Sequence, residues 1–211
     1  MKTLLCNLLF VYTFLNFSFA QDLSKLQTGD VILQPLSCWS CTLIEREENT
    51  IFSHVGLIFK DPRNNQLWVF EANDTVQRVR FEKFIAKNER GQLAKVIRLK
   101  EINNWSPYVK KAFSINFERD FIENFEGLQY DKQFLWDNTD EDGNEKYYCS
   151  ELVAKLLNHF IENKIVGKKM HFNYNRELWE RYFNGPPPHG KWGIAPADLE
   201  RSHLFFEVTH I

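Results

Sequence analysis

Segments typical of β-strands crowd the first half of the 211-residue chain, and this order constrains the fold more than any other feature. Each segment is short and rich in β-branched or aromatic residues, as strands are. They are GDVILQPL (29–36), SHVGLIFK (53–60), LWVFEAN (67–73), TVQRVRF (75–81) and KVIRLK (95–100). The Pro and Asn residues of DPRNNQ (61–66) predict a turn, so the second and third segments should form an antiparallel hairpin. A last strand is expected at LFFEVTHI (204–211).

Helical patterns dominate the second half of the chain. A stripe of four phenylalanines spaced by four residues predicts a helix over 106–125 whose aromatic face points toward the core. A second helix is expected from about residue 150 to 166, before a glycine of the kind that often ends helices. The sheet-like first half and the helical second half, in a chain with 44% hydrophobic residues, predict one compact domain.

The first twenty residues have the pattern of a secretory signal. Lys2 precedes a mostly apolar run, and Ser18 and Ala20 in FSFAQ satisfy the small-residue rule for cleavage. We therefore expect residues 1–20 to be a signal peptide and residues 21–211 to form one secreted or periplasmic domain. No later run approaches the roughly 20 apolar residues of a membrane helix, so no transmembrane segment is expected. The formal net charge of −2 gives no basis for nucleic-acid binding.

Three cysteines follow the predicted signal, and their spacing favours one local disulfide. Cys38 and Cys41 in CWSC can pair with each other, which leaves Cys149 as the unpaired thiol. Free thiols and a redox dithiol remain alternatives for the CWSC pair. Zinc binding would need a second ligand pair, and the acidic loop DNTDEDGNE would place Cys149 where an EF-hand requires glutamate. We therefore expect no metal and no organic cofactor.

Cys149 has the sequence context of a nucleophile. It stands at the start of the second predicted helix, where unpaired backbone N–H groups and the helix dipole stabilise a thiolate. The alternative is a buried, inert thiol. Of the histidines, His54 is the best candidate for the base, because it lies on a predicted strand near a glycine, whereas the others lie in helix, loop or tail contexts.

The predicted hairpin register supplies a partner for His54. If Lys60 lies opposite Leu67, His54 lies opposite Asn73 and diagonally beside Glu71. A carboxylate at this position interrupts the apolar alternation of the strand, which is unusual for packing but suited to orienting an imidazole. Glu71 is therefore the first choice for the third member of a triad, and Asn73 is the second.

Six segments together resemble a known family. In chain order GDVILQ, SHVGLIF, VFEAN, GLQYDKQF, YYCSELV and APADLERS are similar to the YiiX-like branch of the NlpC/P60 superfamily, the circularly permuted papain-like cysteine hydrolases. The resemblance covers nearly all of residues 21–211 and implies a papain-like α+β domain, in which a small antiparallel sheet carrying the histidine packs against the helices, among them the helix bearing the cysteine. By position it makes Cys149 the nucleophile, His54 the general base and Glu71 the residue that orients it. It also implies that the hydroxyl of Tyr130 assists an oxyanion.

The resemblance implies acyl transfer through a thioester, with an amidase or peptidase acting on cell-wall peptides or related amides as the expected activity. A lipid acyl hydrolase or acyltransferase is the alternative within the same chemistry. Two rivals come from other classes: a non-catalytic peptide- or lipid-binding module of this fold, and a thiol–disulfide protein centred on CWSC. The CWSC segment departs from the small polar residues that the family leads us to expect after the first strand.

Overall fold

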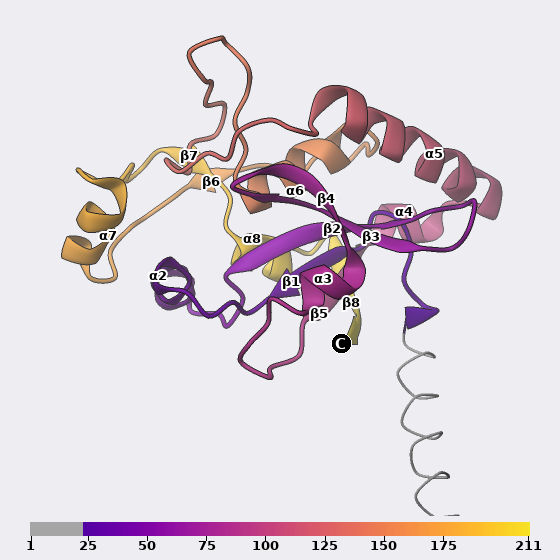
Figure 1. Ribbon diagram of the computed structural model, residues 1–211, viewed down its shortest axis with the longest axis horizontal. Coiled ribbons are helices and arrows are strands. Elements are labelled where there is room, and N and C mark those ends of the chain that lie inside the picture. Colours follow the sequence, from indigo (N-terminus) through magenta and orange to yellow (C-terminus); the bar gives the residue numbers. More distant parts are fainter. Residues whose placement is uncertain (1–22) are drawn as a thin grey trace, which may run out of the picture.

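The computed structural model describes residues 23–211 (Figure 1), and the predicted signal peptide, residues 1–20, lies outside the described residues. The strands are β1 (Val31–Gln34), β2 (His54–Lys60), β3 (Leu67–Asn73), β4 (Thr75–Arg80), β5 (Lys95–Leu99), β6 (Lys168–Lys169), β7 (Trp192–Gly193) and β8 (Phe205–His210). The helices are α2 (Trp39–Glu48), α3 (Phe81–Ile85), α4 (Lys100–Asn104), α5 (Pro107–Asn124), α6 (Cys149–Asn158), α7 (Arg176–Phe183) and α8 (Pro196–Arg201).

Six of the strands form one antiparallel sheet in the order β4-β3-β2-β1-β5-β8, and β6 and β7 form a separate two-stranded ribbon. The predicted α+β class with a small antiparallel sheet is therefore confirmed. The hairpin of β2 and β3 has the predicted register, because Lys60 lies opposite Leu67 and the pairing continues to Leu57 opposite Phe70. The central strands β1 and β2 are almost wholly buried, so both faces of the sheet are covered.

The larger core lies between the sheet and the helices α5 and α6. The predicted aromatic stripe of α5 is buried there, and the ring of Phe121 stacks on Phe70 of β3 with centroids 3.8 Å apart. Burying one such ring contributes about 1.5–3 kcal/mol. On the other face, Phe81 and Phe84 of α3 cover a smaller cluster with Ile58. This layering places the first turn of α6 against β2 and β3, the strands that carry the predicted histidine and glutamate.

Helix α6 begins at Cys149, as predicted, but ends at Asn158 rather than near residue 166. The side chain of Asn158 explains the early end. Its amide donates to the carbonyl of Ile165 at 2.8 Å, and its oxygen accepts from the N–H of Ile165 at the same distance. The segment between them closes into a loop that keeps Ile161 and Ile165 buried, so the apolar pattern continues although the helix does not.

Helices α2 and α7 lie together at the left of Figure 1. Helix α2 buries only Cys41 and Leu43, which is too few residues to produce a helical pattern in the sequence. Helix α7 buries Trp179 fully and packs Leu178, Tyr182 and Phe183 against the core. No helix within residues 23–211 has both the length and the apolar character needed to cross a bilayer.

Candidate active site

Cys149 is the first residue of α6, and contacts with one strand end hold this helix start in place. The side-chain hydroxyl of Ser150 donates to the carbonyl of Ile194 at 2.7 Å, and the hydroxyl of Tyr148 accepts from the N–H of Ile194 at 2.8 Å. Tyr148 is the N-cap residue and supplies no side-chain cap to the helix. First-turn N–H groups of α6 therefore remain available to bind negative charge next to the Cys149 thiol, which is buried and free of any disulfide.

His54 and Glu71 form a buried hydrogen-bonded pair. His54 Nε2 and Glu71 Oε2 are 2.8 Å apart, and both residues are shielded from solvent. The other carboxylate oxygen of Glu71 accepts from Lys87 Nζ and, at 3.3 Å, from the side-chain amide of Gln77. Burial would raise the pKa of Glu71, but its bonds and charge attraction to His54 and Lys87 hold the pKa below its ordinary value. Glu71 is thus a carboxylate at neutral pH.

The imidazole of His54 lies between this carboxylate and the Cys149 thiol. Burial alone would lower the pKa of His54, but hydrogen bonding and charge attraction involving Cys149 and Glu71 outweigh it and raise the pKa to about 9. The ring also stacks on Phe84 of α3, with centroids 5.6 Å apart. Since Nε2 is directed at Glu71, Nδ1 is the nitrogen left for the thiol. The sequence-predicted Cys149, His54 and Glu71 are therefore brought together in space.

Tyr130 lines the same pocket as Cys149, whereas its neighbour Asp131 does not. Burial, and next the charge of Cys149, raise the pKa of Tyr130 well above its ordinary value, so its hydroxyl remains a proton donor at neutral pH. Asp131 is fully buried and accepts from the N–H groups of Gln133 and Leu135 at 2.9 and 2.8 Å. Its part is to shape the loop that carries Tyr130.

The second-choice partner, Asn73, stands at the end of β3, and its carbonyl accepts from Gln77. His54 is bonded to Glu71 instead. The other predicted pair, Cys38 and Cys41, forms a disulfide at the start of α2, where the Cys38 sulfur also accepts from the N–H of Cys41 at 3.0 Å. Neither of these cysteines lines the pocket.

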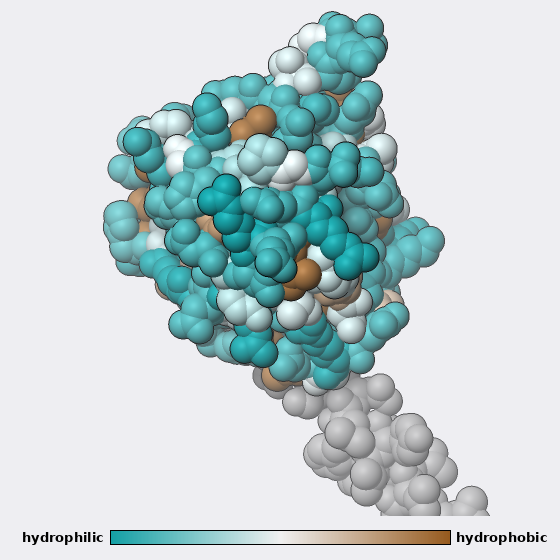
Figure 2. Space-filling view, turned by 90° about the vertical axis from the view of Figure 1, so that its left-hand side faces the viewer, coloured by the Kyte–Doolittle hydropathy of each residue, from teal (hydrophilic) through white to brown (hydrophobic). Residues whose placement is uncertain are grey.

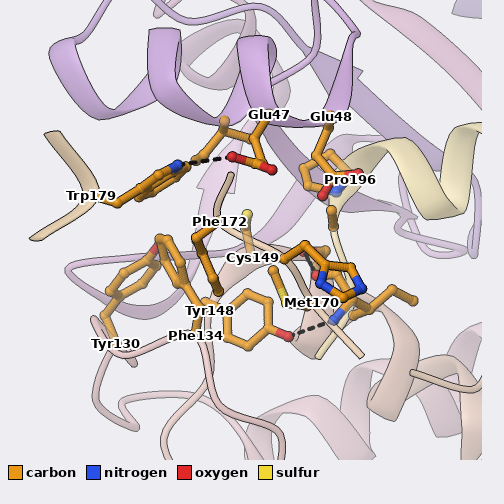
Figure 3. A pocket seen from close by; sticks show the side chains of 15 residues that line it. Glu47, Glu48, Tyr130, Phe134, Tyr148, Cys149, Met170, Phe172, Trp179 and Pro196 are labelled. Carbon is orange, nitrogen blue, oxygen red and sulfur yellow. Dashed lines mark hydrogen bonds between the residues drawn. The ribbon is translucent and has the colours of Figure 1, made fainter. Parts of the chain in front are cut away.

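The pocket beside Cys149 encloses about 410 Å³ of space free of protein atoms, part of it open solvent, and most of its walls come from segments that sequence patterns did not single out (Figure 3). Helix α2 supplies one wall, the 170–179 segment a second and the 194–196 segment a third. Its lining residues are Ile44, Glu47, Glu48, Tyr130, Phe134, Tyr148, Cys149, Ser150, Met170, His171, Phe172, Trp179, Ile194, Ala195 and Pro196. The aromatic and aliphatic residues among them lack any periodic signal, because they come from loops and short helices that meet only in the folded chain.

Within residues 23–211, one group of side chains could offer three metal ligands. The carboxylates of Asp137, Glu145 and Glu151 have oxygens within 4.8 Å of one another. The ammonium of Lys155 already contacts all three, at 2.7 Å from Asp137 and 3.1 Å from Glu151, with the third bond to Glu145. The Lys155 ammonium is therefore already paired with the oxygens that would bind a metal ion. This donor set does not fit a metal centre.

A cysteine at the start of a helix, packed against a sheet that carries a His–Glu pair, is the arrangement of papain-like hydrolases, here with the histidine before the cysteine in the chain. The model of the permuted papain-like amidase family, YaeF/YiiX, C92, matches residues 25–202, and the chain belongs to this family. The crystal structure of the metalloprotein yiiX from Escherichia coli O157:H7 has a similar fold. The match has a TM-score of 0.71 and 22% sequence identity, and it covers 89% of this chain and 98% of that chain. No curated protein matches the chain.

Proposed function

We propose that the protein is an exported cysteine amidase in which Cys149 is the nucleophile, His54 the general acid and base, and Glu71 the residue that orients His54. The observation that carries the proposal is the charge pattern of the site. The raised pKa of His54, about 9, keeps the imidazole protonated at neutral pH, next to a thiol whose helix start favours a thiolate. A thiolate and imidazolium pair is the resting state that acyl transfer by cysteine requires.

The reaction proceeds in two halves. The Cys149 thiolate attacks the carbonyl carbon of the amide, and the carbon–nitrogen bond breaks as His54 gives its proton to the leaving amine. Neutral His54 then takes a proton from water, whose oxygen attacks the thioester. The carboxylic acid leaves, and the thiolate and imidazolium are restored. Glu71 keeps the imidazole oriented through both steps by its 2.8 Å bond to Nε2.

The oxyanion formed at the carbonyl has two sources of stabilisation within reach of Cys149. One is the set of first-turn N–H groups of α6, which no side chain of Tyr148 caps. The other is the hydroxyl of Tyr130, which stays protonated because burial raises its pKa. The helix start is fixed before substrate arrives, since Ser150 and Tyr148 tie it to Ile194.

The proposed compartment and substrate rest on different grounds. Residues 1–20 have the pattern of a secretory signal, which supports a secreted or periplasmic location. Membership of an amidase family supports peptide or amide substrates, with cell-wall peptides as the first class to assay. A second candidate is hydrolysis or transfer of lipid acyl groups, which the mostly apolar lining of the pocket favours.

Activity-based probes provide the test. Electrophilic amide and ester probes, followed by mass spectrometry of the labelled peptide, should place the label on Cys149. The Cys149→Ala variant should neither label nor turn over, whereas replacing Cys38 and Cys41 with serine should leave labelling of Cys149 in place. Turnover that survives Cys149→Ala would refute the hydrolase. Dependence on the Cys38 and Cys41 pair instead would favour a thiol–disulfide activity, and tight ligand binding without turnover would favour a binding module.

A further inference from the structure

The disulfide between Cys38 and Cys41 spans the first turn of α2, but the position of this helix does not depend on it. The two cysteines are three positions apart, so the bond closes a very short loop and removes little freedom from the unfolded chain. Other contacts hold α2 in place. Leu43 is buried in the core, and the carboxylates of Glu45 and Glu47 accept hydrogen bonds from residues far away in the chain. We therefore expect the helix to keep its position when the disulfide opens.

The two sulfurs of the disulfide differ in their access to solvent. Cys38 is exposed, whereas Cys41 is only 5% exposed. Trp39, which follows Cys38, is 47% exposed. The side of the molecule where α2 lies is mostly hydrophilic, with hydrophobic residues visible only as small separate patches (Figure 2). A polar thiol can thus approach from solvent, and the sulfur that it reaches is that of Cys38.

The start of α2 stabilises Cys38 as a thiolate. Cys38 is the N-cap residue of the helix, and its sulfur accepts from the backbone N–H of Cys41 at 3.0 Å. The hydroxyl of Ser40 donates to the same sulfur at 3.3 Å. A thiolate is a stronger acceptor than a disulfide sulfur because it is charged, so both hydrogen bonds strengthen when the disulfide opens.

The charges around this turn act in the same direction. The first turn of α2 contains no acidic residue. The guanidinium of Arg181, on α7, lies over the ring of Trp39 at 5.6 Å from its centroid, which places a positive charge beside the turn. Together with the positive end of the helix dipole, this cation favours the thiolate form of Cys38. A disulfide that is exposed, and whose reduced form is stabilised, is readily reduced.

We propose that Cys38 and Cys41 form a redox-active disulfide that oxidises monothiols, an activity separate from hydrolysis at Cys149. The thiolate of one monothiol attacks the Cys38 sulfur, the S–S bond breaks, and Cys41 leaves and takes up a proton. A second thiolate then attacks the monothiol sulfur of this mixed disulfide and releases Cys38 as a thiolate. Two monothiols are oxidised to one small disulfide, the protein disulfide is reduced, and the second proton goes to Cys38 or to water. The proposal does not rest on the proposed function, since it uses no residue of the triad.

The test follows this disulfide in the mature Cys149→Ala protein, which contains Cys38 and Cys41 and no other cysteine. The protein is mixed at pH 7 with excess 2-mercaptoethanol, an uncharged monothiol, and the reaction is followed by acid quenching, alkylation and mass spectrometry. Reduction of the native protein should be at least tenfold faster than reduction of the same protein unfolded in urea. The reduced protein should also keep its native near-ultraviolet circular dichroism. Equal or slower reduction of the native protein, or unfolding on reduction, overturns the proposal.

Single serine variants show which sulfur is attacked. In the Cys149→Ala protein, Cys41→Ser leaves Cys38 as the one thiol, which should form a mixed disulfide with hydroxyethyl disulfide. Cys38→Ser retains a side chain that can cap α2 and leaves the buried Cys41, which should react at least tenfold more slowly. Equal or faster reaction at Cys41 overturns the proposal.

A matched pair of variants on α7 tests the part played by charge. Arg181→Met should slow reduction of the disulfide by 2-mercaptoethanol at least threefold, because the Cys38 thiolate loses the nearby cation. The control is Arg176→Met on the same helix, where the guanidinium is bonded to Glu180, and this change should leave the rate unaltered. Equal rates in Arg181→Met and Arg176→Met overturn the electrostatic activation on which the proposal depends.

Discussion

Replacing Glu71 with glutamine removes one charge from the centre of the site while keeping its shape. The carboxylate now serves two cations at once, since one oxygen binds His54 and the other binds Lys87. The glutamine amide has an NH2 donor in place of one of the two oxygens, so either His54 or Lys87 loses the oxygen that it now binds. We expect the fold to persist, because Lys87 lies near the surface and can turn toward solvent.

The magnitude follows from the loss of a charge-assisted bond. Hydrogen bonds to charged groups contribute about 1.5–3 kcal/mol, against about 1 kcal/mol for neutral pairs, so the imidazolium loses about 0.5–2 kcal/mol of stabilisation. This corresponds to a fall of roughly half to one and a half units in the pKa of His54. Because that pKa is raised to about 9, activity that needs the imidazolium should be lost as the pH rises through about 9 in the unaltered protein. In Glu71→Gln this loss should occur at lower pH, and turnover near pH 9 should fall roughly 2- to 16-fold, because less of His54 is then protonated.

The Lys87→Met substitution should shift the pKa of His54 in the opposite direction. Removing the ammonium leaves Glu71 with its full charge for His54, so the pKa of His54 should rise and the alkaline loss of activity should move to higher pH. The assay is kcat/KM for a chromogenic amide substrate between pH 5 and 10, with Lys87→Arg as the charge-conserving control and thermal unfolding as the check on folding. A pH profile that moves in the same direction in Glu71→Gln and Lys87→Met would show that the charge of Lys87 does not act on His54 through Glu71. Unchanged activity in Glu71→Gln together with inactive Asn73→Ala would show that Asn73 is the orienting residue.

Three further predictions concern other parts of the molecule. Thiol titration of the mature protein should find one reactive group before reduction and three after it, and a bridge that includes Cys149 would contradict the Cys38–Cys41 disulfide. Burial raises the pKa of Glu151 from 4.5 to about 8, so the free energy of unfolding should fall as the pH rises from about 4.5 to about 8, and Glu151→Gln should flatten this dependence. Glu47→Ala leaves three N–H donors without their acceptor and should lower the free energy of unfolding by about 1–3 kcal/mol. It should also raise KM more than it lowers kcat. An unchanged melting temperature would show that Glu47 does not hold the 173–179 segment in place.

The parts of this protein that sequence patterns predict are those in which local preference and burial agree. The strands β1 to β5 and β8 are short and rich in β-branched or aromatic residues, and the hairpin register follows from the turn that precedes Leu67. The same register brings His54 and Glu71 to one side of the hairpin, so two members of the site could be paired before the fold was known.

The end of α6, the walls of the pocket and the place of Lys87 depend on tertiary contacts that produce no periodic pattern in the sequence. The end of α6 is set by the bonds between Asn158 and Ile165, which compete with a helix that the apolar pattern would allow to continue. One wall of the pocket comes from α2, a mostly polar helix, and a second comes from the 170–179 segment, whose backbone N–H groups bind Glu47. Lys87 forms an ion pair with Glu71 and lies just after α3, but no rule of sequence spacing links these two residues.

The central claim, that Cys149 is a nucleophile activated by His54, is tested most directly by the rate at which iodoacetamide alkylates Cys149 at pH 6. A thiol in an unfolded chain is almost wholly protonated at this pH and reacts slowly, because the thiolate is the reactive form. Cys149 in the native protein should react at least tenfold faster than in the denatured protein, despite its burial, and His54→Ala should remove the advantage. If Cys149 reacts only after denaturation, or if its native rate is the same with and without His54, the thiol is structural and the protein is not a cysteine hydrolase.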